Sequence, residues 1–155
     1  MIFISLGTQK IPFARMLEMV DELILKRNIS EEVIAQVGYT NYNSERFRCI
    51  NFIDEETFKE YINKASFIIT HAGSGALFSA IKMGKKTIAV ARLHKFGEMI
   101  DDHQTELTTK LSSEGYILDG TNSIVDAYDK LKCFTPRSND FKCSIATELY
   151  KIINS

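Results

Sequence analysis

Short apolar runs alternate with helical patterns along this sequence, and that alternation is the feature that most limits its fold. Ile2 to Leu6 and Phe67 to Thr70 are the most strand-like runs, and others occupy 33–37, 49–53, 87–91 and 116–118. Between them, apolar residues recur at helical spacing, beginning after Phe13. Strands that alternate with helices in this way are typical of βαβ units. We therefore predict an α/β, Rossmann-like open parallel sheet with helices on both faces.

Several residues mark where the helices should begin and end. Pro12 suits the first turn of the first helix, and Asp54 is a suitable N-cap for the second. Gly84 is a candidate C-cap for the helix that follows the fourth strand. Apolar residues at helical spacing near the end of the sequence predict a C-terminal helix at about 139–153. Further helices are expected up to Leu111 and at about 123–131.

Composition narrows the class of protein. The sequence has 155 residues, enough for one domain covering 1–155, and 19 basic against 20 acidic residues give a net charge of -1. That balance argues against nucleic-acid binding, and no apolar run reaches the roughly 20 residues needed to span a bilayer. Three separated cysteines (Cys49, Cys133 and Cys143) with no CxxC pair are typical of thiols in a reducing cytoplasm, so we expect a cytoplasmic protein.

Three polar or glycine-rich segments follow predicted strands. They are Gly7-Thr8-Gln9, His71 to Gly75, and the segment from Arg92 to Gln104. In open parallel sheets, ligands bind outside the carboxyl ends of the strands. We therefore expect the three segments to form one site.

The segment His71-Ala72-Gly73-Ser74-Gly75 carries the sharpest signal. Two glycines allow a ligand to approach the backbone closely, and a helix that begins here directs free N–H groups at it, so a phosphate or diphosphate is the expected ligand. A tight strand-to-helix turn without any ligand explains the same residues. Gly7-Thr8 likewise fits either a second phosphate contact or a simple turn closed by the hydroxyl group.

Other chemistries fit these residues less well. Ser74 lies in a G-x-S-x-G-like setting, but a hydrolase would need adjacent Asp102 and His103 as its acid and base. The three histidines show no i, i+4 pair, so no metal site is expected. Basic residues near the segments, including Arg92 and Lys95, fit either a solvated turn or an electropositive approach for an anionic ligand.

Together, the motifs resemble the C-terminal, donor-binding half of glycosyltransferase family 28 and its GT-B relatives. Ser5-Leu6-Gly7-Thr8 resembles the loop that opens this half, and 71–75 resembles its H-A-G-x-G motif. Asp102-His103-Gln104, with Glu106 and Leu107, is similar to its N/D-H-Q-x-E-L motif. Order and spacing agree over about 1–118, and the similarity is greatest to stand-alone members. These are the donor-binding subunit of the dolichol-linked GlcNAc transferase and bacterial capsule and exopolysaccharide subunits.

This resemblance implies a UDP-sugar donor and no tightly bound cofactor. It implies that the diphosphate is bound by Gly7, Thr8, His71, Gly73, Ser74 and Gly75, that the sugar is reached by Asp102, His103 and Gln104, and that Arg92 and Lys95 supply basic contacts. His71 and His103 are the catalytic candidates. Many relatives carry a glutamate that binds the ribose where this chain has Ser79.

A GT-B site lies between two domains, and this chain resembles one of them. The leading hypothesis is therefore the donor-binding, catalytic subunit of a two-component inverting glycosyltransferase that acts on a lipid-linked polysaccharide intermediate. A membrane-anchored, acceptor-binding subunit would recruit it to the inner face of the plasma membrane. The alternative that Ser79 favours is a non-catalytic accessory or enhancer subunit. A serine hydrolase is the third hypothesis.

Overall fold

Six parallel strands form one sheet in the order β3-β2-β1-β4-β5-β6 in this computed structural model, which describes residues 1–137. The strands are β1 (Ile2–Ser5), β2 (Val33–Gln36), β3 (Arg48–Ile50), β4 (Phe67–His71), β5 (Thr87–Val90) and β6 (Leu118–Asp119). Every pair of neighbours is parallel, with β1 between β2 and β4. The predicted fold class is confirmed.

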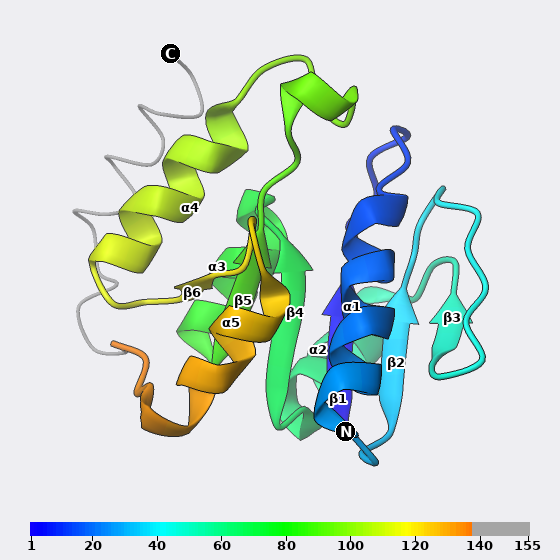
Figure 1. Cartoon of the computed structure of the whole chain (residues 1–155), viewed down its shortest axis with the longest axis horizontal. Helices are drawn as coiled ribbons and strands as arrows, with labels where there is room; N and C mark the ends of the chain where they lie inside the picture. The colour runs from blue at the N-terminus through cyan, green and yellow to red at the C-terminus, as the bar shows by residue number, and fades with distance from the viewer. Residues whose placement is uncertain (138–155) are drawn as a thin grey trace.

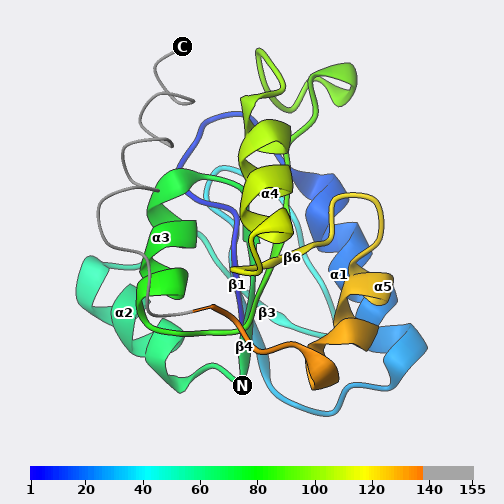
Figure 2. The ribbon, with the colours of Figure 1, turned by 90° about the vertical axis from the view of Figure 1, so that its left-hand side faces the viewer.

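Helices connect the strands and cover both faces of the sheet (Figures 1 and 2). They are α1 (Ala14–Arg27), α2 (Glu55–Lys64), α3 (Ser74–Lys82), α4 (His103–Ser113) and α5 (Ile124–Lys130), with short 3-10 turns η1 (His94–Phe96) and η2 (Leu131–Cys133). Figure 2 shows the sheet edge-on, with α1 and α5 on one side and α2 and α3 on the other. The predicted helix at 139–153 and Cys143 lie outside the described residues.

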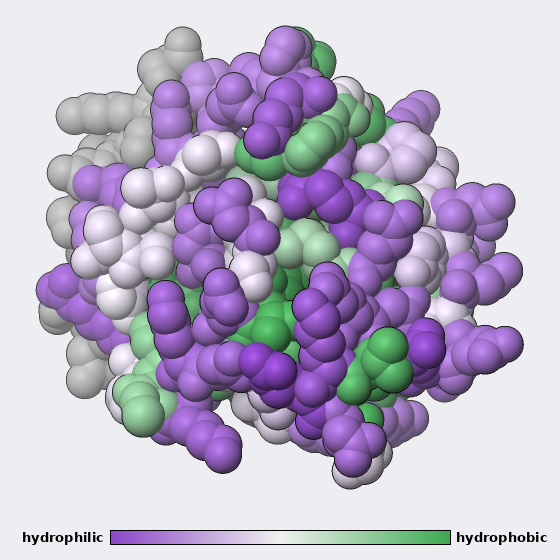
Figure 3. Space-filling model, in the orientation of Figure 1, coloured by the Kyte–Doolittle hydropathy of each residue, from purple (hydrophilic) through white to green (hydrophobic). Residues whose placement is uncertain are grey.

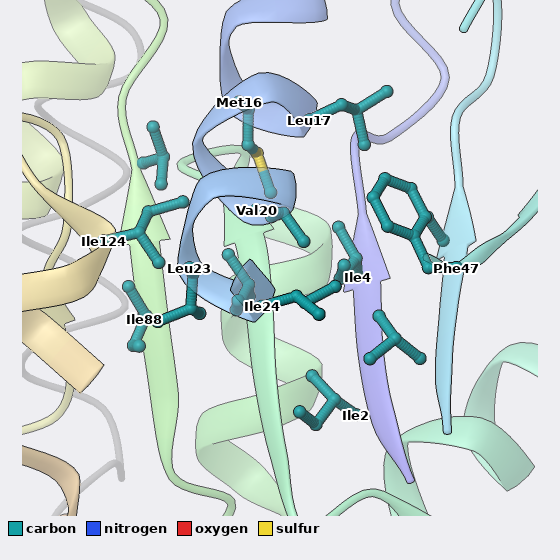
Figure 4. Packing of buried hydrophobic residues seen from close by; sticks show 14 of the residues in the cluster. Ile2, Ile4, Met16, Leu17, Val20, Leu23, Ile24, Phe47, Ile88 and Ile124 are labelled. Atoms are coloured by element: carbon teal, nitrogen blue, oxygen red, sulfur yellow. The ribbon is translucent and has the colours of Figure 1, made fainter. Parts of the chain in front are cut away.

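Alternating side chains of the buried strands build a hydrophobic core on each face. Ile2 and Ile4 of β1 pack beneath Leu17 and Leu23 of α1 (Figure 4), whereas Phe3 packs with the α2 face of the sheet. A third cluster joins α3 and α4 to β5. Because strands in a doubly covered parallel sheet are buried on both faces, they appear in the sequence as continuous apolar runs.

Some predicted element limits were wrong. The third strand is Arg48–Ile50 and not 49–53, because its pairing with β2 ends at Ile50. The first helix begins at Ala14, so Pro12 lies before its N-cap, Phe13. The other signals are confirmed: Asp54 caps α2 through a bond from Thr57 N, and Gly84 follows α3 with φ +67°.

The strand order reverses between β1 and β4, which lie side by side although α1, β2, β3 and α2 separate them in sequence. Connections leave the carboxyl ends of these two strands toward opposite faces of the sheet, at the top of Figure 1. In open parallel sheets this switch point is where ligands bind. The segments after Ser5 and after His71 therefore meet there.

The surface over α1 and α5 is mainly hydrophilic, with a hollow between the two helices in which apolar side chains are visible (Figure 3). This α1–α5 groove has a volume of about 500 Å³, and its apolar lining consists of Met19, Leu93, Phe96, Ile124 and Val125. It lies on the face of the sheet opposite to α2 and α3.

Candidate functional site

Two adjoining cavities lie at the carboxyl edge of the sheet. The larger, of about 570 Å³, lies between the starts of α2 and α3, and the smaller, of about 260 Å³, lies at the start of α4. Gln9, Gly73 and Ser74 line both cavities, so we describe them together as the cleft. Of the predicted site residues, Gly7, Thr8, His71, Gly73, Ser74 and Gly75 line the larger cavity, and Gly73, Ser74, His103 and Gln104 line the smaller one.

His71 lies at the bottom of the larger cavity, in a slot between two glycines. A Cβ at Gly7 would lie 2.6 Å from its Nε2, and one at Gly73 would lie 2.7 Å from its Cδ2, both too close for a side chain. Gly7 also has φ +73°, in the left-handed region that favours glycine. The two glycines are therefore required by the imidazole between them, in addition to any approach by a ligand.

The hydrogen bonding of His71 fixes its tautomer. Nδ1 lies 3.3 Å from the carbonyl oxygen of Ser5, which can only accept, so Nδ1 carries the hydrogen and Nε2 of the neutral ring has a free electron pair. Burial lowers the pKa of His71 to about 4, and the Arg92 charge acts in the same direction, against the Ser5 carbonyl. At neutral pH this histidine is therefore an acceptor at Nε2.

The N-terminus of α3 opens into the cleft. Its N-cap, Gly73, has no side chain, and no acidic residue occupies the first turn. Gly75 has no atom within 4 Å of where a Cβ would lie. The positive end of the helix dipole therefore faces open space lined by Thr8 and Ser74, an arrangement that suits an anion.

The start of α4 places His103 and Gln104 of the predicted Asp102-His103-Gln104 motif at the cleft, but not Asp102. His103 lies between two carboxylates, 3.5 Å from Asp101 and 3.6 Å from Glu106. Gln104 is buried, and its Oε1 accepts a hydrogen bond from Arg92 N. Asp102 lies outside both cavities, and its carboxylate accepts from His94 N. The neighbouring Asp101 is the aspartate that lines the cleft, and a sugar contact from Asp102 stays a prediction.

The two expected basic contacts do not reach the cleft. Arg92 is only 1% exposed, and its guanidinium donates to backbone carbonyls behind the Gly7 loop. Lys95 is exposed, with its ammonium 4.9 Å from the centre of the Phe96 ring, and it lines the α1–α5 groove. Neither side chain lines the cleft, so direct contacts of Arg92 and Lys95 with a donor stay predictions that this geometry does not favour.

The sequence interpretation missed Gln36. It ends β2, is 4% exposed and lines the larger cavity, and its buried Oε1 has no hydrogen-bond partner among residues 1–137. Ile53 and Phe58 form an apolar wall of the same cavity. A polar residue at the end of a predicted strand, as in Gln36-Val37-Gly38, was the available signal.

Two further sequence hypotheses concern serines. Ser79 lines the larger cavity, but its Oγ donates to Gly75 O of its own helix at 2.9 Å. Ser74 forms no hydrogen bond with an imidazole within residues 1–137, so the hydrolase arrangement is not assembled there. Nor does any group of three metal-ligating side chains gather in this described part of the chain.

Comparison with known families identifies the group to which this fold and these motifs belong. Residues 1–139 match the glycosyltransferase family 28 C-terminal domain. The chain belongs to this family. Its structure is similar to the solution structure of ALG13, with a TM-score of 0.65 and 14% identity over 97% of this chain and 94% of that one. It is also similar to MurG of Acinetobacter baumannii, with a TM-score of 0.57 and 17% identity over 85% of this chain and 40% of that one.

Among curated relatives of this family 28 domain are UDP-N-acetylglucosamine transferase subunits named ALG13. The Homo sapiens protein is 29% identical over 76 residues, which cover 49% of this chain and 6% of that protein. The Candida glabrata protein is 22% identical over 109 residues, which cover 70% of this chain and 52% of that protein. The chain thus spans about half the length of the Candida glabrata protein and a small part of the Homo sapiens protein. In residues 1–137, no helix is both long and apolar enough to cross a membrane.

Proposed function

We propose that this chain is the donor-binding, catalytic subunit of a two-component inverting glycosyltransferase that uses a UDP-sugar. The observation that carries the proposal is the cleft at the β1–β4 switch point, where the Gly7 loop and the open N-terminus of α3 face one another. Family membership and the name of the curated relatives, UDP-N-acetylglucosamine transferase subunit, support a nucleotide sugar as the ligand.

The cleft suits a molecule that is anionic at one end. The diphosphate would lie at the start of α3, against Thr8, Ser74 and the backbone of Gly73. The nucleoside would occupy the rest of the larger cavity against Ile53 and Phe58, and the sugar would extend into the smaller cavity toward Gln104.

Transfer would proceed by a single displacement. The acceptor hydroxyl oxygen bonds to C1 of the sugar from the face opposite to the diphosphate, the bond from C1 to the diphosphate oxygen breaks, and its electron pair leaves with UDP. The free N–H groups of α3 would stabilise this departing charge. His71 and His103 are this chain's candidates for accepting the hydroxyl proton, and His103 has the more open position. His71 could do so only while its Nε2 is unprotonated, so a His71 that donates to the diphosphate would leave this role to His103.

The acceptor side requires a second component. The cleft lies at the edge of the sheet, where the Gly7 loop, the end of β2 and the starts of α2, α3 and α4 line it within residues 1–137. A membrane-anchored subunit that binds a lipid-linked polysaccharide intermediate would complete it and hold this chain at the cytoplasmic face of the plasma membrane. The word "subunit" in the names of the curated relatives is consistent with such an assembly.

Calorimetry with UDP on the full chain, together with any subunit that co-purifies, tests the proposal. Because Nε2 of neutral His71 and a phosphate oxygen are both acceptors, their direct contact requires a proton on Nε2. We expect UDP binding near pH 7 to take up a proton, seen as a heat that depends on the ionisation enthalpy of the buffer. Absence of UDP binding, with and without the co-purified subunit, would overturn the proposal.

A second candidate is a non-catalytic accessory subunit, and the state of Ser79 favours it. Its hydroxyl donates within its own helix, and the cavity has no carboxylate at this position where many relatives have the glutamate that binds the ribose. An accessory subunit would leave sugar transfer by its partner unchanged when His71 or His103 is replaced. A catalytic subunit would lose transfer in the same assay.

A further inference from the structure

Arg92 connects three segments that border the cleft. Its Nη2 and Nη1 donate to the carbonyls of Leu6 (3.3 Å) and Ile11 (2.6 Å), which are the two ends of the loop carrying Gly7 and Thr8. Nη1 also lies 3.4 Å from the carbonyl of Glu98, in the loop after β5. The backbone N–H of Arg92 donates to Gln104 at the start of α4.

The side chain of Arg92 is buried, and it forms no salt bridge in the described part of the chain. The nearby Glu98 carboxylate pairs with Arg15, at 2.8 Å and 3.0 Å, and also accepts from Leu93 N. Its charge also favours the charged form of Arg92, so two arginines share one carboxylate and one positive charge is left over. Arg92 has instead three carbonyls and the face of the Phe13 ring, 4.7 Å from the guanidinium carbon, and its buried Nε has no partner. Burying a cation costs free energy unless a nearby opposite charge compensates it.

An anion bound in the cleft would compensate the remaining positive charge at Arg92. Leu6, whose carbonyl accepts from Arg92, directly precedes Gly7, and Gly7 packs against the His71 ring in the cleft. The Arg92 charge also acts on His71, whose pKa it lowers in the same direction as burial does. Because Arg92 is itself buried, its charge is screened less by solvent than that of a surface arginine, and it acts on an anion across the intervening loop.

We propose that Arg92 is a positioning residue whose buried charge holds the diphosphate of the donor in the cleft from behind the Gly7 loop. The inference rests on the proposed function and adds a residue that does not touch the ligand. Arg92 therefore has two roles that substitution can separate. It fixes the loop through its N–H groups, and it attracts the anion through its charge.

Two substitutions separate these roles, with Arg92→Lys keeping the charge and Arg92→Gln keeping N–H donors without the charge. Arg48→Gln, which removes an exposed arginine on β3, is the matched control. The measurements are the affinities for UDP and UMP on the full chain with any co-purified subunit, and the pKa of His71 by NMR in the free chain. A thermal melt of each variant reports folding.

If the charge acts as proposed, Arg92→Gln weakens UDP binding about tenfold or more and UMP binding much less, because the diphosphate carries the additional charge. It also raises the pKa of His71. Arg92→Lys leaves the pKa of His71 close to that of the unsubstituted chain and weakens UDP binding less than Arg92→Gln does, because it keeps the charge and loses only the multiple N–H contacts. Arg48→Gln leaves both quantities unchanged.

The opposite pattern overturns the inference. If Lys and Gln weaken UDP and UMP binding alike and neither moves the pKa of His71, Arg92 is only a structural brace. If the unsubstituted chain binds neither nucleotide, the proposed function fails, while the His71 titration still decides whether the Arg92 charge reaches the cleft. If Arg92→Gln does not fold, Arg92→Met with the same titration replaces it.

Discussion

Helices α2 and α3 begin on the same cavity, and their first turns are opposite in character. Asp54 caps α2 by accepting from Thr57 N, and two glutamates follow in the first turn. The N-cap of α3 is Gly73, with no side-chain bond and no acidic residue after it. The positive end of α2 is thus already compensated by carboxylates, and that of α3 is not. The difference indicates that an anion should bind to α3 and avoid α2.

Giving α3 an acidic start should cause the largest change. Ser74→Asp places a carboxylate where the diphosphate is expected, and we expect UDP affinity to fall about 1,000-fold, since like charges in contact cost several kcal/mol. The fold should tolerate it, because an acidic first turn stabilises a helix by about 0.3–1 kcal/mol. Calorimetry with UDP measures the effect. Ser30→Asp, at an exposed position before β2, is the control.

If Ser74→Asp leaves UDP affinity unchanged, the anion does not bind at the start of α3, and the proposed difference between α2 and α3 is wrong. The thermal midpoint must be measured on the same sample, so that unfolding is not mistaken for loss of the site.

Acidification should weaken the fold through the histidine beside α3. The pKa of His71 is 6.5 when unperturbed and about 4 in the folded chain, so the unfolded chain binds more protons between these values. The free energy of unfolding should therefore fall as pH drops from 6.5 toward 4, by up to about 3 kcal/mol. Denaturant unfolding at several pH values measures the slope. His71→Gln should flatten it, whereas the exposed His94→Gln should not.

The two glycines that flank Ser74 should respond in opposite directions to alanine. A Cβ at Gly73 collides with His71, so Gly73→Ala should destabilise the fold by about 1–3 kcal/mol. Gly75 lies within α3 with open space around it, and Gly75→Ala should stabilise by roughly 0.5 kcal/mol. Denaturant midpoints give both values.

The reason for the Gly73 effect can be checked directly. In a His71→Ala background the collision disappears, and Gly73→Ala should become almost neutral in a double-mutant cycle. An equal cost in both backgrounds would show that the backbone of Gly73, and not the imidazole, requires glycine.

Neutralising a carboxylate on α2 should have the smallest effect. Glu55 lines the larger cavity but is exposed and paired with Lys59, so Glu55→Gln should tighten UDP binding by only about twofold. Calorimetry at low ionic strength makes the change measurable. Glu60→Gln, farther along α2 and paired in the same way with Lys64, should have no effect.

Local signals in the sequence predicted the elements and much of the site. Asp54 and Gly84 act on atoms within a few residues, so their roles could be inferred from the sequence. The sequence could not show which aspartate faces the cleft, because successive residues at a helix start point in different directions, and Asp102 accepts from His94 N. Its neighbour Asp101 lines the cleft instead. The burial of Arg92 could not be inferred, since its carbonyl partners belong to distant residues.

The sequence alone determined the order of strands and helices, because apolar periodicity and turn residues are local properties. It also identified the glycine-rich segments after β1 and β4 and the histidine motif that begins α4. The tertiary structure decided which side chains of these segments lie together and which are buried. Only the parallel pairing of β1 with β4 places Gly7 against His71, and only packing behind that loop buries the Arg92 charge. Burial and strand pairing depend on residues that are far apart in the sequence. They determine the protonation state of a side chain and the charges around it.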